Sequence, residues 1–202
     1  MSKKKFRLSK KQIVLIAACA VLLVFFILSA KVIDKGTEGQ YTGIVAFDAS
    51  ESSSGDWEKI AAEIIEKAED ITGIDPKDLK GKAIKLTGTI TKYEFNVKAK
   101  KCTITVTPEG YTGKVEYRVN LSEVNIAKAL AEAQTVKGFG DVTNQTEFSQ
   151  YSTALNKLAY DQVVVPLGID ESFEGKTITV YGAAVKESGS RVTITPVQIT
   201  IE

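Results

Sequence analysis

The chain has 202 residues, of which 26 are basic, 25 are acidic and none is histidine. Without histidine it lacks the usual general base near neutral pH and the commonest metal ligand in proteins. Its two cysteines, Cys19 and Cys102, form no Cys-x-x-Cys pair, which argues against a zinc site and a disulfide framework, so we expect no metal and no cofactor.

The first 30 residues predict a membrane anchor. Residues 1–12 carry six basic side chains and no acid, and residues 13–30, IVLIAACAVLLVFFILSA, carry no charge. At about 1.5 Å per residue, a helix of this length spans about 27 Å, close to the hydrocarbon thickness of a bilayer. Because the basic residues precede it, we predict a single-pass helix with a cytoplasmic tail at 1–12 and an extracytoplasmic part at 31–202.

Two other fates of the apolar run remain open. The sequence IAAC at 16–19 fits a lipoprotein signal, but lipidation at Cys19 would leave a mature protein that begins inside its own apolar run. Cleavage after Ala30 would put Leu28 where a signal peptidase needs a small residue. We therefore favour a retained anchor, in which Cys19 is an inert thiol.

The charge balance changes beyond the anchor. After residue 30 the chain has 20 basic and 25 acidic side chains, a net charge of about −5. Nucleic-acid binding needs a basic surface, so this balance argues against it. Lys98, Lys100 and Lys101 form one local basic cluster, which is typical of a solvated hairpin tip.

A polar stretch precedes the first predicted helix of the extracytoplasmic part. Residues 31–55 include ASESSSGD and are predicted to be a tether, with a folded domain over 56–202. Apolar residues at spacings of four, four and three predict a helix at about 56–71, which Ser54 or Asp56 could cap.

Five segments alternate apolar and polar residues with the period of a half-buried strand, namely 82–90, 101–107, 114–121, 176–185 and 191–202. In the last of them the apolar positions change from even to odd numbers at Pro196. Proline cannot donate a hydrogen bond to a neighbouring strand, so a bulge or an edge position is expected there.

Two further helices are predicted between the third and fourth strands. Ser122 could cap a helix at about 123–134. Asn144 and Glu147 form a capping-box pattern for a helix at about 145–160.

Two similar stretches, GKAIKLTG at 81–88 and GKTITVYG at 175–182, begin similar pairs of strands. A phosphate-binding loop would need glycine at positions 76 and 170, which are proline and aspartate, and a helix rather than a strand after it. Each copy is instead predicted to be a β-hairpin, with Gly88 and Gly182 allowing the sheet to curl. We therefore predict an α+β domain, an OB-like small β-barrel of two similar hairpins, a third strand and two to three helices; a duplicated pair of half-barrels is the alternative.

The densest polar stretch, GFGDVTNQTEFSQYSTALN at 138–156, surrounds a predicted helix start, which offers free N–H donors. Helix capping alone explains Asn144 and Glu147, whereas a binding surface would use more of the stretch. The candidate contact residues are Phe139, Asp141, Thr143, Asn144 and Gln145. No catalytic residues can be assigned, because no pattern places a base beside a nucleophile.

The same stretch and the closing GKTITVYGAAV resemble a bacterial family of predicted periplasmic lipoproteins of unassigned function, whose members accompany sugar ABC transporters. The segments AKVIDKG, AFDA and GKAIKLTGTI fit too, and the Gly-Asp-x-Thr-Asn-Gln motif matches at 140–145. The family usually has a lipid-bearing cysteine directly after the apolar run, where this chain has SAKV.

The resemblance implies a membrane-anchored, non-enzymatic accessory module that binds a sugar importer, its solute-binding protein or a carbohydrate. Two alternatives remain. A cell-envelope hydrolase or transferase would need convergent acids or a Ser–Lys pair in a cleft. An OB-type module for oligosaccharides or anionic polymers would need an electropositive groove with exposed aromatic residues.

Overall fold

The computed structural model describes residues 47–123, 125, 127–187 and 189–202. The predicted cytoplasmic tail, the anchor with Cys19 and most of the predicted tether lie outside these residues. Within them, no helix combines the length and the apolar character that crossing a bilayer requires. The chain divides into the units Met1–Phe47 and Asp48–Glu202, and the second unit is the one described here.

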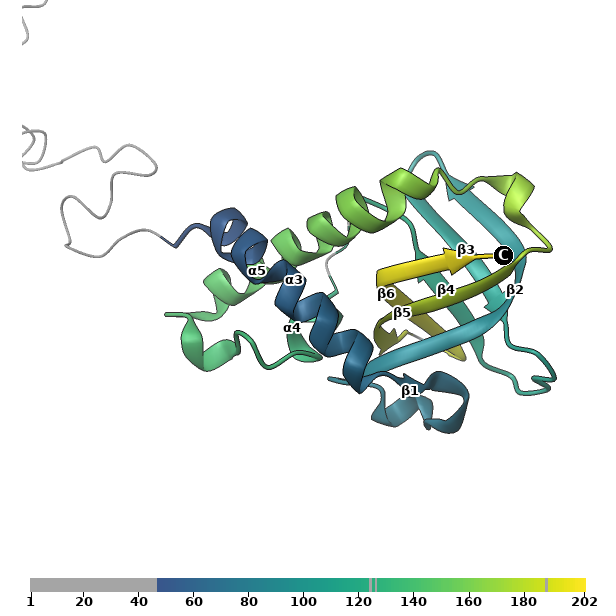
Figure 1. Cartoon of the computed structure of the whole chain (residues 1–202), viewed down its shortest axis with the longest axis horizontal. Helices are drawn as coiled ribbons and strands as arrows, with labels where there is room; N and C mark the ends of the chain where they lie inside the picture. Colours follow the sequence, from purple (N-terminus) through teal and green to yellow (C-terminus); the bar gives the residue numbers. More distant parts are fainter. Residues whose placement is uncertain (1–46, 124, 126, 188) are drawn as a thin grey trace, which may run out of the picture. The chain divides into compact units, whose positions relative to one another are not determined.

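Five strands form a closed barrel (Figure 1). They are β2 (Ala83–Asn96), β3 (Lys101–Thr107), β4 (Glu116–Asn120), β5 (Thr177–Lys186) and β6 (Arg191–Ile201). The strand order is β2-β3-β4-β6-β5, and β5 pairs back with β2 to close the barrel. Only β4 and β6 run parallel within it. This is the strand order of an OB barrel, so the prediction of one OB-like barrel is confirmed and the duplicated half-barrels are not found.

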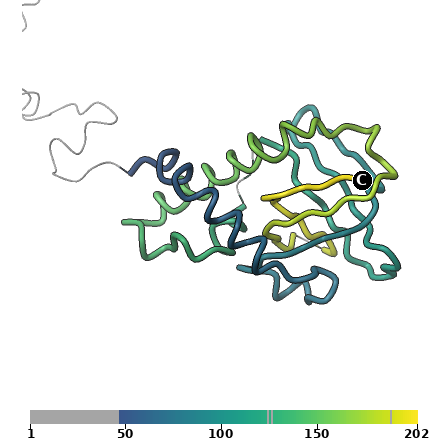
Figure 2. Tube along the Cα trace, viewed as in Figure 1, coloured from purple at the N-terminus to yellow at the C-terminus, as the bar shows by residue number. Residues whose placement is uncertain are grey.

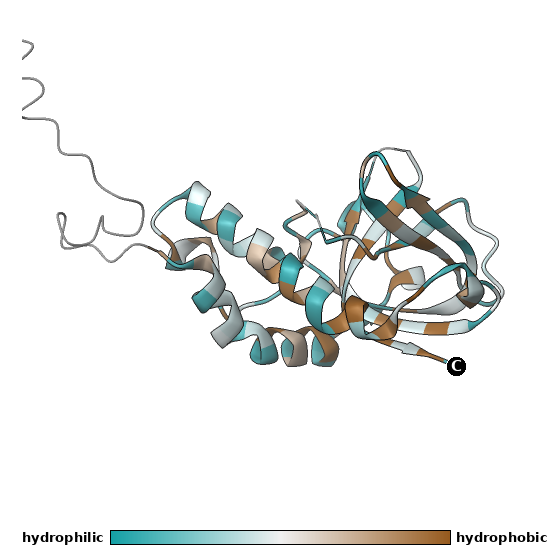
Figure 3. Ribbon diagram, turned by 90° about the horizontal axis from the view of Figure 1, so that it is seen from above, coloured by the Kyte–Doolittle hydropathy of each residue, from teal (hydrophilic) through white to brown (hydrophobic). Residues whose placement is uncertain are grey.

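Strand β2 closes the barrel because its two halves have different partners. Residues 83–89 pair with β5, and residues 89–96 pair with β3. A short strand β1 (Glu69–Asp70) adds to β2 in parallel. The core inside is apolar, and its fully buried side chains include Ile84, Leu86, Ile104, Val119, Ile178, Val180 and Ile194. Figure 3 shows the alternation of apolar and polar positions along the strands.

The two predicted glycine positions are points where backbones cross closely. A Cβ atom on Gly88 would collide with the carbonyl of Thr107 in the partner strand β3. A Cβ atom on Gly182 would collide in the same way with the carbonyl of Thr195 in β6. The two hairpins therefore use the same device to bend around the core, which confirms the predicted role of these glycines.

Each hairpin also contains one bulge. In β6 the register shifts next to Pro196, where Val197 is the extra residue, as the phase change in the sequence predicts. In β2 the extra residue is Thr91, since Ile90 pairs with Val106 and Lys92 pairs with Thr105. This second bulge was not predicted.

The helices lie to one side of the barrel (Figures 1 and 2). The α-helices are α3 (Ala49–Lys67), α4 (Ala129–Glu132) and α5 (Gln145–Ala159). A π-turn, Tyr160–Val164, continues α5, and 3₁₀ turns occupy Ile71–Gly73, Pro76–Asp78, Phe139–Asp141, Val165–Leu167 and Glu171–Phe173.

Helix α3 begins seven residues before its predicted start and ends at Lys67 rather than 71. Its cap is Asp48, which accepts hydrogen bonds from the backbone N–H groups of Ser50 (2.8 Å) and Glu51 (2.9 Å). The assignment of the cap to Ser54 or Asp56 was therefore wrong. Residues 49–55, which were predicted to belong to the tether, are helical.

The predicted helix at 123–134 was largely wrong, because α4 has only four residues. Ser122 does not cap it. Its hydroxyl accepts from the backbone N–H of Cys102 (2.8 Å) and donates to the carbonyl of the same residue (3.1 Å), which extends the pairing of β3 with β4.

Helix α5 confirms the predicted helix at 145–160, although its capping differs in detail. Asn144 accepts from the N–H groups of Thr146 (2.9 Å) and Glu147 (3.0 Å), as predicted. Glu147 accepts from the N–H of Thr143 (2.8 Å) rather than from that of Asn144. The polar motif thus fixes both the start of α5 and the turn before it.

Candidate functional site

The loop that follows α4, residues 133–138, is organised by one buried amide. The side chain of Gln134 donates to the carbonyls of Ala131 (3.1 Å) and Lys137 (2.5 Å), and it accepts from the N–H of Lys137 (2.9 Å). Gln134 is only 6% exposed, so these bonds satisfy polar groups that water does not reach. The loop therefore has a defined shape although it is not regular structure.

Helix α3 holds the same loop at Thr135. The carboxylate of Glu63 accepts from the backbone N–H of Thr135 (3.0 Å) and from its hydroxyl (2.7 Å), and it pairs with Lys67 (2.6 Å). Burial by itself would raise the pKa of Glu63, but the hydrogen bonds from Lys67 and Thr135 outweigh it and hold the pKa below its ordinary value. Glu63 is thus an ionised clamp between the helix and the loop.

A second polar cluster joins α3, the loop and α5. The ammonium of Lys137 donates to the hydroxyl of Ser52 and lies 3.6 Å from the carboxylate of Asp56. The hydroxyl of Tyr151 donates to the same carboxylate (3.1 Å), and Lys137 lies 5.3 Å from the centre of its ring. Burial, followed by the charge of Asp56, raises the pKa of Tyr151 above its ordinary value.

Beside this loop lies a groove of about 610 Å³. Its lining combines aromatic, amide and charged side chains, and the residues are Lys80, Gly81, Lys128, Ala131, Glu132, Gln134, Gly138, Phe139, Gln145 and Phe148. The rings of Phe139 and Phe148 meet edge to face, with their centres 5.7 Å apart. Phe139 is 57% exposed, whereas Phe148 is buried, so the groove has an apolar floor and one accessible ring.

Charged groups border the aromatic floor. Lys128 lies 5.8 Å from the ring centre of Phe148, within the range of a cation–π contact. Lys80 and Glu132 form an ion pair of 3.5 Å, in which the lysine side chain is largely exposed. A volume of this size, with an apolar floor and a few polar groups, is typical of a ligand-binding cleft.

The five predicted contact residues divide into two groups. Phe139 and Gln145 line the groove. Asp141 accepts from the N–H of Gly138 (2.8 Å), Asn144 caps α5, and Thr143 donates its N–H to Glu147. The last three therefore shape the backbone around the groove.

Sequence analysis did not identify Lys80, Lys128 and Gln134 as groove residues. They come from three separate segments, and no local motif links them. A buried glutamine is the one signal that the sequence carried, but only the fold shows that Gln134 is buried.

The described residues contain no group of three or more side chains that could hold a metal ion. Ser52 and Lys137 do form a Ser–Lys contact, the arrangement that nucleophilic catalysis would need. A catalytic lysine base must be neutral, however, and the adjacent carboxylate of Asp56 and the ring of Tyr151 favour the ammonium form. The geometry is that of a structural ion pair.

The outer face of β3 and β4 carries paired charges. Arg118 contacts Glu116 (2.7 Å) and Glu94 (3.2 Å), and Lys92 contacts Glu94 (2.7 Å). The hydrogen bond from Lys92 lowers the pKa of Glu94, and the charge of Arg118 adds to this effect. Acids and bases balance here, so this face does not attract an anionic polymer in the way that an electropositive groove would.

Comparison with known proteins gives one family and one fold. Residues 77–200 match a family described as "Predicted periplasmic lipoprotein (DUF2291)". A crystal structure of an OB-fold protein from Thermotoga maritima aligns with a TM-score of 0.54 and 15% identity, over 78% of this chain and 99% of that one. At this identity, the likeness shows the fold alone.

Two OBody proteins bound to hen egg-white lysozyme, AM1L10 and AM3L09, align more weakly. Each has a TM-score of 0.35 and 15% identity, over 67% of this chain and 93% of that one. No curated protein matches the chain.

Proposed function

Because the chain belongs to the DUF2291 family of predicted periplasmic lipoproteins, we propose that it is a membrane-attached, non-enzymatic module that serves a sugar importer outside the cytoplasm. In this role the OB barrel is the scaffold, and the groove beside the 133–138 loop is the contact surface. The contacted component is the importer or its solute-binding protein.

The observation that carries this proposal is the exposed ring of Phe139 over an apolar floor. Exposed aromatic residues in clefts are the usual anchors of protein contacts, because they bury a large area and lose little conformational entropy. Phe139 is held by a turn that Asp141 fixes, and the loop behind it is fixed by Gln134 and Glu63. The ring is therefore preorganised for binding.

A second candidate is direct binding of a carbohydrate. The groove combines aromatic rings with the side-chain amides of Gln134 and Gln145 and with the charged groups of Lys128 and Glu132. Sugar rings offer one apolar face and several hydroxyl groups, so this combination suits them. The volume of about 610 Å³ is enough for a small saccharide.

The enzymatic alternatives have less support. A hydrolase or transferase would draw on Ser52 and Lys137, whose surroundings favour a charged lysine. An anionic-polymer module would draw on the β3–β4 face, where acids and bases are paired.

Membrane attachment follows from either of two N-terminal chemistries, a retained helix at 13–30 or a lipid on Cys19. We favour the helix because the 11 residues after Cys19 are uncharged and mostly apolar. Intact-mass measurement of the protein from native membranes distinguishes the two. A full-length mass supports the helix, and a mass that begins at Cys19 with added acyl chains supports the lipid.

The test of the proposed role is crosslinking and co-purification of the full-length protein from its native membranes. Phe139→Ala, alone and combined with Gln145→Ala, should lose the importer component that the unmodified protein recovers. Val165→Ala is the matched control, because Val165 is 53% exposed and does not line the groove. Equal recovery with all variants would refute the groove as the contact surface.

The carbohydrate candidate is tested on the same variants by calorimetric titration with mono- and disaccharides. Binding that Phe139→Ala abolishes would support it. Importer recovery that depends on Phe139 without any saccharide binding would leave the groove as a protein-contact surface.

A further inference from the structure

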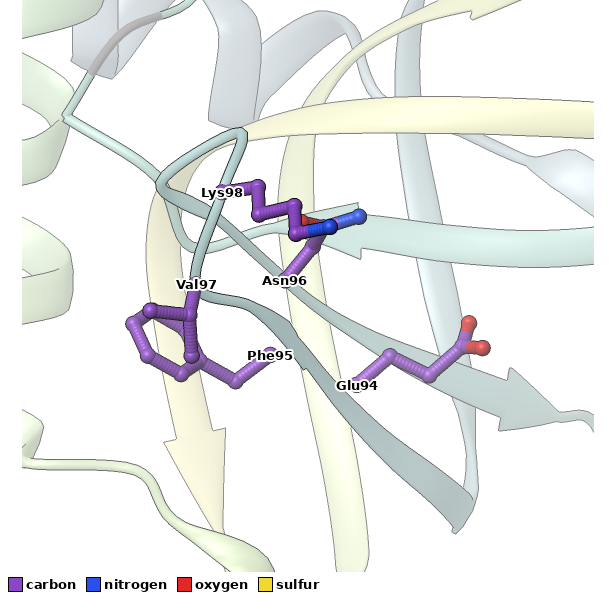
Figure 4. Close-up of a pocket in the computed structure, with 5 residues that line it drawn as sticks. All are labelled: Glu94, Phe95, Asn96, Val97 and Lys98. Carbon is purple, nitrogen blue, oxygen red and sulfur yellow. The ribbon is translucent and has the colours of Figure 1, made fainter.

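The tip of the β2–β3 hairpin combines exposed apolar side chains with a cluster of positive charge. Phe95 is 57% exposed and Val97 is 74% exposed, and they belong to the four exposed large hydrophobic residues of the described chain. With Glu94, Asn96 and Lys98 they line an open hollow of about 500 Å³. Figure 4 shows Phe95 and Val97 on one side of the hairpin and Glu94 on the other.

The apolar pair is a consequence of the bulge at Thr91. Before the bulge, even-numbered residues such as Ile90 face the core; after it, odd-numbered residues take that face. Tyr93 still packs against the core, but Phe95 and Val97 lie beyond it. The apolar face of the barrel thus continues onto a hairpin whose β2 strand pairs with β3 alone.

The charge at this tip is opposite to that of the domain. Residues 48–202 contain 18 basic and 23 acidic side chains. Lys98, Lys100 and Lys101 are clustered at the tip, and all three are exposed. None of them forms an ion pair with another described residue. The nearest acid along the strand, Glu94, is already paired with Lys92 and Arg118.

We propose that this tip, residues 95–101, contacts the surface of an anionic lipid bilayer. Phe95 and Val97 enter the interface, and the lysine ammonium groups bind lipid phosphates while their stems lie along the apolar boundary. The proposal concerns a surface separate from the groove and does not depend on the groove's partner.

Two observations favour a bilayer over a protein as the occupant. Three lysines of one sign around two apolar side chains match a surface of uniform negative charge, and an open hairpin tip has no shaped pocket for a specific partner. The chain also keeps the tip near the membrane. Seventeen residues separate the apolar run from Asp48, and such a segment spans at most about 60 Å when extended.

The test places a tryptophan reporter at the tip of the full-length protein. Trp57→Phe removes the single native tryptophan, and Phe95→Trp then reports on the tip. The protein is reconstituted in vesicles of phosphatidylcholine with or without phosphatidylglycerol, and quenching by brominated lipids is measured. Circular dichroism verifies that each variant is folded.

Phe139→Trp in the same background is the matched control, because Phe139 and Phe95 are equally exposed at 57%. We expect strong quenching and a blue shift at position 95 in anionic vesicles, and neither at position 139. Lys98→Gln with Lys101→Gln should weaken the contact by about fivefold for each lysine removed.

Two results would overturn the proposal. One is emission at position 95 that remains unquenched and solvent-like in anionic vesicles. The other is equal quenching at positions 95 and 139, which would mean that the domain lies on lipid without using the tip. If position 95 responds only when an importer component is added, the occupant of the tip is a protein and the lipid proposal is wrong.

Discussion

Within residues 48–202 the barrel is closed by apolar packing, whereas the helical side beside it is fixed by polar contacts. Barrel strands fill their interior with isoleucine, leucine and valine and use glycine where two backbones cross. The loop at 133–138 is instead held by Gln134, Glu63 and Lys137.

This difference explains where the groove can form. Apolar packing leaves a barrel of one shape and few exposed features, because every methyl group is needed to fill the core. Directed hydrogen bonds can hold an irregular loop open beside a cleft, since they fix positions without filling the space. The barrel therefore carries most of the stability, and the polar side carries the candidate site.

The most direct way to break the barrel is to put a side chain at a backbone crossing. Gly182→Val should lower the free energy of unfolding by at least about 3 kcal/mol, because its Cβ would collide with the carbonyl of Thr195. Urea denaturation measures the loss. Gly55→Ala, in open space on α3, is the control and should cost nothing; a loss below about 1 kcal/mol for Gly182→Val would contradict the crossing.

A smaller effect is expected from the polar cluster. Lys137→Met should cost about 1–2 kcal/mol, because it leaves Ser52 and Asp56 without their cation while these groups are only partly exposed. Hydrogen exchange should show faster opening of the 133–138 loop than of the barrel strands. Equal acceleration in both regions would mean that the two sides are not held separately.

The motif at the start of α5 gives an effect of about 1 kcal/mol. Asn144→Ala removes the acceptor for two helix N–H groups and should lower the free energy of unfolding by that amount. Gln145→Ala, one position later and exposed, should change it by less than about 0.5 kcal/mol. If the two variants cost the same, capping is not the structural role of Asn144.

Acid should weaken the helical side before the barrel, and by less than about 1 kcal/mol. The folded pKa of Glu63 lies below its ordinary value of 4.5, so its contribution is complete above that value and is lost as the pH falls through the folded pKa. Urea titrations between about pH 6 and pH 3 should show the difference between the unmodified protein and Glu63→Gln shrinking towards zero. A difference that stays constant over this range would exclude the clamp.

The sequence predicted the barrel well because its evidence is local and repeated. Matching Gly-Lys hairpins and the phase change at Pro196 each reflect a few neighbouring residues. The phase change at Thr91 was visible in the same way, in Tyr93 and Phe95, but no proline marks it. The second bulge was therefore missed.

The errors arose where a distant residue decides the outcome. Ser122 is a good helix cap by local rules, yet it bonds to Cys102, 20 positions away. The polar run before Trp57 suggested a tether, but Asp48 caps it as a helix in which Ser53 is buried. In the candidate site, Phe139 and Gln145 were found from their motif, whereas Lys80, Lys128 and Gln134 meet them only in the folded chain.

The seam between β2 and β5 also sets an order of events during synthesis. It joins residues 83–89 to residues 177–183, which lie 88 to 100 positions apart. Contacts at such separations form slowly, and until they form, half of β2 presents an open edge that can pair with other chains. A chain that stops before Thr177 cannot close at all. The final 26 residues thus decide whether each copy becomes a barrel or a sheet with an open edge.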